Sequence, residues 1–150
     1  MLETVVTPVH ETLPVLGVGM GYRDPLCNDI LQCRDKIDFL EITADHFLQS
    51  PAVRWRFLDK LRSKYTLIPH GLNLSLGSAE GLDLEYLNEL VELIEFVKPP
   101  WWSEHIAFTK AGEIEIGHLS PLAFNQESID AFCDNVHEVQ DRIQTPLILE

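Results

Sequence analysis

The sequence predicts an α/β fold with a parallel sheet, and three observations support this prediction. Strand-like and helix-like stretches alternate along residues 15–150. The strand candidates are almost continuously apolar, which is typical of parallel strands covered on both faces. Three metal-capable side chains, His70, His105 and Glu150, end three successive strand candidates. Their placement favours a barrel of the triosephosphate isomerase type, because functional residues of such barrels emerge at the carboxyl ends of several strands.

Five segments have strand character and are separated by helical patterns. They are residues 14–22, 37–43, 66–71, 101–108 and 145–150, of which the first has the sequence "PVLGVGMGY" and the last "TPLILE". A doubly wound nucleotide-binding fold would place the pattern G-x-G-x-x-G after its first strand. The glycines at positions 17, 19 and 21 miss that spacing. This mismatch also favours the barrel over the doubly wound sheet.

The first two helices are predicted from a capping residue followed by proline. Asp24–Pro25 is expected to open a helix that continues to about Lys36. Ser50–Pro51 repeats the pattern and opens a helix that continues to about Lys64. In both cases the acidic or hydroxyl side chain can accept a backbone N–H, and proline is favoured in the first turn.

The last two helices are predicted from apolar residues at helical spacing. Asp83 is the expected cap of the third helix, and Pro99–Pro100 ends it. The stripe of this helix comprises Leu84, Leu87, Leu90, Val91, Ile94 and Val97. The buried stripe of the fourth comprises Ile129, Phe132, Cys133, Val136, Val139 and Ile143. Residues 110–124, "KAGEIEIGHLSPLAF", are expected to form a longer loop.

The predicted barrel is incomplete. A full barrel has eight strands and typically about 250 residues, whereas these 150 residues supply five strands and four helices. The first and last strands would therefore have open edges, which favour pairing with another chain or self-association. The sequence predicts the N-terminal portion of a barrel domain at 15–150, preceded by a polar lead-in at 1–14 that lacks a signal-peptide pattern.

Charge and cysteine usage limit the classes of partner and compartment. The formal net charge is −13, with 24 acidic against 11 basic residues. This balance argues against nucleic acid and anionic membranes as partners, and it would attract a metal ion or a cationic peptide. The sequence contains no run of about 18 apolar residues, so it predicts no membrane-spanning helix. The odd number of cysteines, 3, suits a reducing compartment, so we expect a cytoplasmic protein.

The three strand-end residues form the candidate metal site. Neighbouring strands lie about 4.8 Å apart, so side chains at their ends can converge. Two imidazoles and a carboxylate suit Fe(II), Mn(II) or Zn(II), with positions left for water or substrate. Taken singly, each of His70 and His105 could instead be a hydrogen-bonded core histidine, and Glu150 a solvated side chain. Burying all three together without a metal is costly, which favours the metal site.

Three further residues are candidates for the site. Asp45, in "TADHF" after the second strand, is interpreted as a fourth ligand, an acceptor for a histidine N–H, or a turn residue. His46 is a further candidate ligand in the same segment. Glu104 precedes His105 and should point to the opposite side of a regular strand, so a supporting role is expected before a ligand role.

The segments "LGVGMGYR", "IDFLEITADHF", "PHGLNLSLGS", "WWSEHIAF", "GHLSPLAF" and "PLILE" occur in that order along residues 15–150. With these segments the chain resembles the multinuclear non-haem iron-dependent oxidative enzymes (MNIO). The resemblance implies a triosephosphate isomerase-type barrel that holds two or three irons. It also implies use of O₂ to modify cysteines or other residues of ribosomally made peptides (RiPP biosynthesis), often with a peptide-recognition partner protein.

The resemblance also assigns roles to individual residues. His70 and His105 match iron ligands of the family, and Glu150 matches the glutamate that closes the fifth strand. Asp45 stands where the family has a carboxylate, and His46 replaces the asparagine that usually follows it. The later ligands of the family lie beyond Glu150, so this chain would supply only part of the metal site.

These inferences lead to one functional hypothesis and two alternatives. The complete fold is expected to be an iron-dependent oxidase or oxygenase that acts on a peptide, with residues 1–150 alone inactive. A divalent-metal sugar isomerase or hydrolase on a similar barrel is the first alternative. A non-catalytic half-barrel that dimerises or binds a partner is the second.

Overall fold

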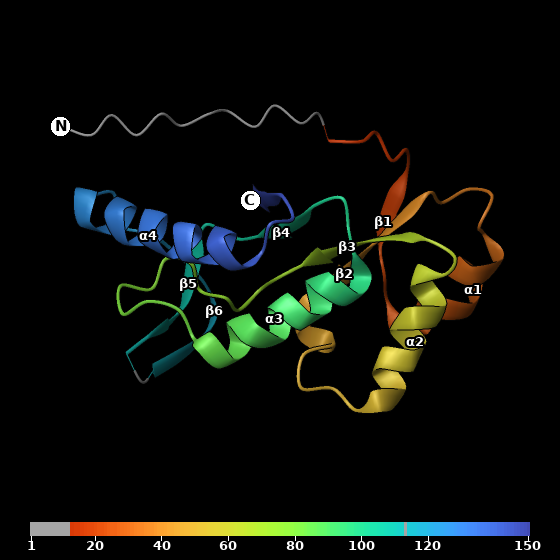
Figure 1. Ribbon diagram of the computed structural model, residues 1–150, viewed down its shortest axis with the longest axis horizontal. Coiled ribbons are helices and arrows are strands. Elements are labelled where there is room, and N and C mark those ends of the chain that lie inside the picture. Colours follow the sequence, from red (N-terminus) through yellow and green to blue (C-terminus); the bar gives the residue numbers. More distant parts are fainter. Residues whose placement is uncertain (1–12, 113) are drawn as a thin grey trace.

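The structure is a computed structural model that describes residues 13–112 and 114–150 (Figure 1). The predicted lead-in at 1–14 therefore lies almost entirely outside the described residues. The strands are β1 (Gly19–Gly21), β2 (Phe39–Thr43), β3 (Thr66–His70), β4 (Trp102–Glu104), β5 (Ala107–Ala111), β6 (Ile114–Pro121) and β7 (Leu147–Leu149). The α-helices are α1 (Cys27–Gln32), α2 (Ala52–Arg62), α3 (Leu84–Val97) and α4 (Gln126–Arg142). Two 3₁₀ turns, η1 (Asp24–Leu26) and η2 (Ala44–His46), precede α1 and follow β2.

Five strands form one parallel sheet in the order β1-β2-β3-β4-β7. Successive parallel strands are therefore neighbours, as in the wall of a barrel, and α-helices precede β2, β3, β4 and β7. This arrangement confirms the predicted α/β class and the N-terminal part of a triosephosphate isomerase-type barrel. Within the described residues, β1 pairs only with β2 and β7 only with β4.

The hydrophobic core lies mainly on one face of the sheet. Along β2, Leu40 and Ile42 are fully buried, whereas Phe39, Glu41 and Thr43 on the other face are half-buried. The buried face packs against leucines of α2 and α3 that have no exposed surface: Leu58, Leu61, Leu87, Leu90 and Leu93. Each buried leucine contributes about 1.5–3 kcal/mol. The half-buried face corresponds to the interior of a barrel, and it is the face that carries the candidate site.

Two of the four helices have the expected kind of cap. The Asp83 carboxylate accepts the backbone N–H groups of Glu85 and Tyr86, which confirms it as the cap of α3. At α4, Asn125 caps the helix by accepting the N–H of Ser128. These caps satisfy donors that the first turn of a helix otherwise leaves unpaired.

The caps predicted for the first two helices are wrong. Asp24 makes no cap hydrogen bond; its carboxylate pairs with Arg54 at 3.0 Å and accepts the Tyr22 hydroxyl. The Ser50 hydroxyl donates backwards to the carbonyl of His46. The first helix is also shorter than predicted, because a 3₁₀ turn replaces its start and α1 ends at Gln32.

The predicted loop at 110–124 is wrong. This segment instead supplies most of an antiparallel hairpin in which β5 pairs with β6. The predicted strand at 101–108 is correspondingly divided into β4 and the start of β5. The alternation of isoleucine and glutamate at 114–116 is the period-two signal of a strand, and Gly112 at φ +58° permits the turn. Within the described residues, no helix combines the length and the apolar character needed to cross a membrane.

Fewer residues of the apolar stripe of α4 are buried than predicted. Val139 and Ile143 are buried, whereas Ile129 is 51% exposed and Cys133 is exposed. The prediction of Cys133 as a core residue is therefore wrong. The buried residue near the middle of α4 is Asn135, which donates from its side-chain amide to the carbonyls of Leu76 and Ser78. Helix α4 thus fixes the loop that follows β3.

Candidate metal centre

Three strand ends bring the predicted ligands together. His70 is the last residue of β3, His105 follows β4, and Glu150 follows β7. Each residue offers one ligand atom, and these atoms all lie within 4.8 Å of one another. The three strands are neighbours in the sheet, so the convergence follows directly from their parallel order (Figure 1). Because the side chains meet at the carboxyl edge, this is where a barrel enzyme would have its site.

The two imidazoles face one another through their Nε2 atoms, which are 3.1 Å apart. The rings are 4.7 Å apart between centroids and cross at 77°. Two nitrogens that each lie about 2.1 Å from one ion at angles of about 90–109° are separated by about 3.0–3.4 Å. The separation of the histidine nitrogens is that of a hydrogen bond between the two rings, and it also fits shared coordination of a single divalent ion.

Ser103 sets the orientation of the His70 ring. The register of β3 and β4 places Ser103 beside His70, and its hydroxyl lies 2.8 Å from His70 Nδ1. If Nδ1 carries the proton and donates it to Ser103, Nε2 keeps its lone pair for a metal. Sequence reasoning missed Ser103, although it is two residues before His105 and strand alternation puts both on one face.

Glu150 brings the negative charge of the group. Its Oε1 lies 3.9 Å from His70 Nδ1, and half of its side chain is exposed. The backbone is fixed on both sides, because the Glu150 N–H donates to the Glu104 carbonyl and the Glu150 carbonyl accepts the N–H of Ile106. The side chain can therefore rotate toward an ion while its attachment point stays in place.

Glu104 is buried behind the ligands, with 1% of its surface exposed. Its carboxylate accepts the N–H of His105 at 2.8 Å and of Leu74 at 3.4 Å. Burial raises the pKa of Glu104 to about 7, with the nearby negative charge of Asp45 acting in the same direction. Glu104 is outside the group of converging ligand atoms, and its supporting role stays a prediction.

Asp45 fixes the loop after β3. Its carboxylate accepts the Leu72 N–H at 2.9 Å, the Asn73 side-chain amide at 2.7 Å and the Tyr86 hydroxyl at 2.9 Å. Burial, followed by the negative charges of Asp45 and Glu104, raises the pKa of Tyr86 above its ordinary value. Asp45 is outside the group of converging ligand atoms, and its role as a ligand or as an acceptor for a histidine stays a prediction. No sequence signal pointed to Tyr86.

His46 is exposed and lies apart from the converging ligands. It lines a hollow of about 200 Å³ together with Tyr22, Thr43 and Arg54. The hollow is at the carboxyl ends of β1 and β2, on the same edge of the sheet as the candidate centre. The structure therefore brings His70, His105 and Glu150 together, whereas Asp45, His46 and Glu104 are outside the group.

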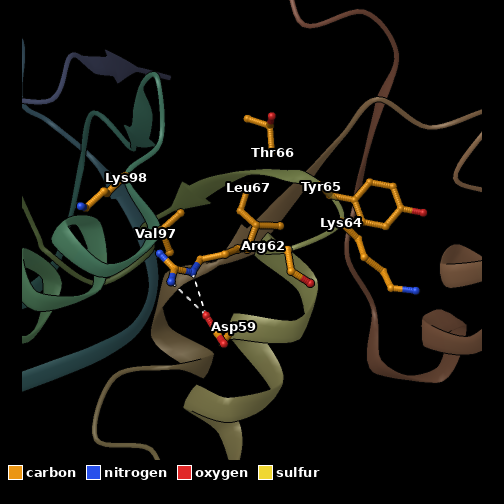
Figure 2. A pocket seen from close by; sticks show the side chains of 9 residues that line it. Asp59, Arg62, Lys64, Tyr65, Thr66, Leu67, Val97 and Lys98 are labelled. Carbon is orange, nitrogen blue, oxygen red and sulfur yellow. Dashed lines mark hydrogen bonds and ion pairs between the residues drawn. The ribbon is translucent and has the colours of Figure 1, made fainter.

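A second hollow lies at the opposite end of β3. It has a volume of about 550 Å³ and is lined by Arg62, Lys64, Thr66 and Lys98, among others. Figure 2 shows Arg62 directed at Asp59, with which it forms an ion pair at 3.0 Å. These basic residues cluster where α2 and α3 end, which is a favourable place for positive charge. The cluster is explained by helix termini and is remote from the ligand ends of the strands.

Replacing Gly71 with alanine is expected to destabilise the protein by roughly 1–3 kcal/mol, as overpacking of a core does. A Cβ at Gly71 would lie 2.4 Å from the Glu104 carboxylate oxygen and 3.7 Å from the Ser103 carbonyl. Urea denaturation measures the loss. In the Glu104→Asp variant, whose acid is shorter, Gly71→Ala should cost less stability than it does in the wild type. An equal cost of Gly71→Ala in the wild type and in Glu104→Asp would contradict the steric explanation.

Comparison with known proteins places residues 17–150 within one family model, described as the RiPP precursor modification enzyme MbnB/TglH/ChrH. RiPP denotes a ribosomally synthesised and post-translationally modified peptide. This match covers nearly the whole segment predicted as a barrel.

Several curated relatives are similar over most of the chain. A UPF0276 protein of Vibrio parahaemolyticus is 34% identical over 133 residues, 89% of this chain and 46% of the relative. One of Caulobacter vibrioides is 32% identical over 138 residues, 91% of this chain and 49% of the relative. One of Streptomyces avermitilis is 35% identical over 158 residues, 100% of this chain and 32% of the relative. The chain thus spans about half the length of most of these relatives, or less.

Proposed function

Because the chain belongs to the MbnB/TglH/ChrH family of RiPP precursor modification enzymes, we propose that it supplies part of the active site of an iron-dependent enzyme. This enzyme uses O₂ to oxidise a residue, cysteine in the first instance, of a ribosomally synthesised peptide. The observation that carries the metal part of the proposal is the convergence of His70, His105 and Glu150 within 4.8 Å. The family match supports the peptide part.

The donor set fits iron. Two histidines and one carboxylate with open positions are the ligand type of non-haem Fe(II) oxygenases. Iron bound there would supply the one-electron chemistry with O₂ that side chains lack. The chain's own residues position it: His70 and His105 offer Nε2 lone pairs, and Glu150 offers a compensating negative charge. With its proton on Nδ1 and donated to Ser103, the His70 ring would present Nε2 to the ion.

We further propose that ligands from outside residues 1–150 complete a centre of two or three irons. The three converging side chains suit one ion, with coordination positions left open. The peptide substrate would reach this centre with or without a peptide-recognition partner protein. Cys27, Cys33 and Cys133 are all free, which supports a reducing, cytoplasmic location.

Ser103→Ala is expected to lower the affinity for Fe(II) about 10-fold, within the range of 10–100-fold for partners of metal-bound histidines. The ring of His70 loses its 2.8 Å partner and populates other orientations and tautomers. Anaerobic Fe(II) titration of the full-length protein measures the change. Ser103→Thr keeps the hydroxyl and should stay close to the wild type. Unchanged affinity in Ser103→Ala would show that the hydroxyl does not orient the ligand.

Elemental analysis and oxygen uptake together test the function as a whole. The full-length protein, purified anaerobically, should contain iron. With a cysteine-bearing peptide encoded beside it, the protein should consume O₂ and change the peptide mass. Bound Mn or Zn without iron, and no oxygen uptake, would favour the sugar isomerase or hydrolase alternative. A soluble dimer without metal would favour the non-catalytic half-barrel.

A further inference from the structure

A cleft of about 730 Å³ separates the loop after β3 from the β5–β6 hairpin. One wall comes from the loop at 73–83 and the start of α3, and the other from the two hairpin strands. The first wall follows the ligand His70 in the chain, and the second follows the ligand His105. This volume is in the range of ligand-binding sites in proteins.

Acidic side chains dominate the charge of the cleft. Its lining includes Glu80, Asp83 and Glu115, against one basic residue, Lys110. Lys110 is opposite Glu115 in the hairpin register, so its positive charge is offset there. Glu80 and Asp83 are on the other wall and both are exposed, with the Asp83 carboxylate also accepting two N–H groups as the cap of α3. The lining therefore complements a positively charged ligand.

Three glycines leave the rim of the cleft without side chains. They are Gly81, Gly112 and Gly117, and a Cβ placed on any of them would meet nothing within 4 Å. Backbone along this rim is therefore open to close approach by another main chain. A rim of this kind suits an extended peptide.

The two walls are held together before any ligand binds. The Ser75 hydroxyl accepts the Thr109 N–H at 2.8 Å and lies 2.7 Å from the Ser78 hydroxyl. Ser78 donates in turn to the Lys110 carbonyl. Ser75 has a φ of +60°, an unfavourable value for serine that these contacts maintain. Because the cleft is preformed, binding of a peptide would cost little free energy for ordering the protein.

We propose that this cleft binds an extended, positively charged segment of the peptide that the enzyme modifies. This inference rests on the proposed function and adds to it the charge and place of one substrate segment. Asn73 is three residues after His70, and Thr109 is four after His105, so the walls begin within about 10–14 Å of the ligands. A lysine or arginine of the substrate is therefore expected about three to five positions from the modified residue.

Fluorescence anisotropy on the full-length protein, made metal-free with EDTA, tests the cleft. The probe is a fluorescein-labelled decapeptide of alternating lysine and glycine, with a glutamate–glycine peptide as its counterpart. Glu80→Lys/Glu115→Lys should raise the Kd for the lysine probe at least tenfold. Asp35→Lys/Glu92→Lys makes the same change in net charge at exposed positions outside the cleft and should raise it less than twofold. Equal effects of the two double variants would overturn the proposal, because overall charge would then explain binding.

Cross-linking gives a second test that needs no variant. A benzophenone on the lysine probe should attach to residues 73–83, 109–112 and 114–117 of the wild-type protein. Attachment elsewhere would overturn the proposal. Both measurements use metal-free protein, so they are independent of iron. Cleft binding without iron or oxygen uptake would contradict only the proposed function. Iron and turnover without cleft binding would contradict only this inference.

Discussion

His70→Ala in the full-length protein is expected to lower the affinity for Fe(II) by at least about 100-fold. Loss of a residue that only hydrogen-bonds to a metal ligand costs up to about 100-fold, and loss of the ligand itself should cost more. The substitution removes one of two nitrogens that lie 3.1 Å apart and leaves His105 and Glu150 with an open side. His105→Ala should have the same effect for the same reason. Anaerobic Fe(II) titration and the iron content of the purified protein are the measurements.

The matched control is His137→Ala, the same substitution at an exposed position on α4. It should leave iron content unchanged. His70 is half-buried and is not part of the hydrophobic core, so His70→Ala should keep the fold. Circular dichroism checks this and so separates loss of metal from loss of fold. Full iron occupancy and turnover in both His70→Ala and His105→Ala would refute the metal centre.

The metal-free protein is expected to lose about 3 kcal/mol of stability between about pH 4.5 and pH 7 through Glu104 alone. Burial raises the pKa of this carboxyl to about 7 in the folded protein, from its ordinary value of 4.5. An acid with a raised pKa binds its proton more tightly in the folded state. Its contribution to the free energy of unfolding is therefore complete below the pKa of the unfolded state. The contribution disappears as pH rises through the pKa of the folded state.

Urea denaturation between pH 4.5 and pH 8 measures this slope. Glu104→Gln cannot ionise and should flatten the slope over the same window, while other titrating groups act equally on both proteins. A wild-type slope equal to that of Glu104→Gln would show that the buried carboxyl does not titrate in this range. Iron should reduce the effect, because a nearby cation favours the ionised carboxylate.

Much of the barrel wall could be predicted, because its signals are local. Continuous apolar runs identified the five parallel strands, and the Asp83 cap and leucine spacing identified α3. The wrong cap at Asp24 is due to tertiary contacts. Asp24 has the right chemistry for a cap, but Arg54 and Tyr22 engage it instead. The hairpin was missed because its period-two signal at 114–116 is short and ends at Gly117.

The candidate site was predictable to the extent that it depends on strand ends. Parallel order alone places residues 70, 105 and 150 at one edge, and the structure brings their ligand atoms together; that they bind metal stays a prediction. The hydrogen bond between Tyr86 and Asp45 joins residues that are 41 positions apart in the sequence, so it depends on how the chain between them folds. Such contacts have no local pattern, so sequence reasoning could not choose among the alternatives for Asp45.

The three candidate ligands are separated by 35 and 45 positions along the chain, and only the assembled sheet brings them together. An unfolded chain would therefore chelate an ion poorly, and mass action would let the ion favour the native state. At a free metal concentration of 100 times its dissociation constant, this linkage is worth about 2.7 kcal/mol. A metal ion at this site would then add to the stability of the fold as well as supply chemistry.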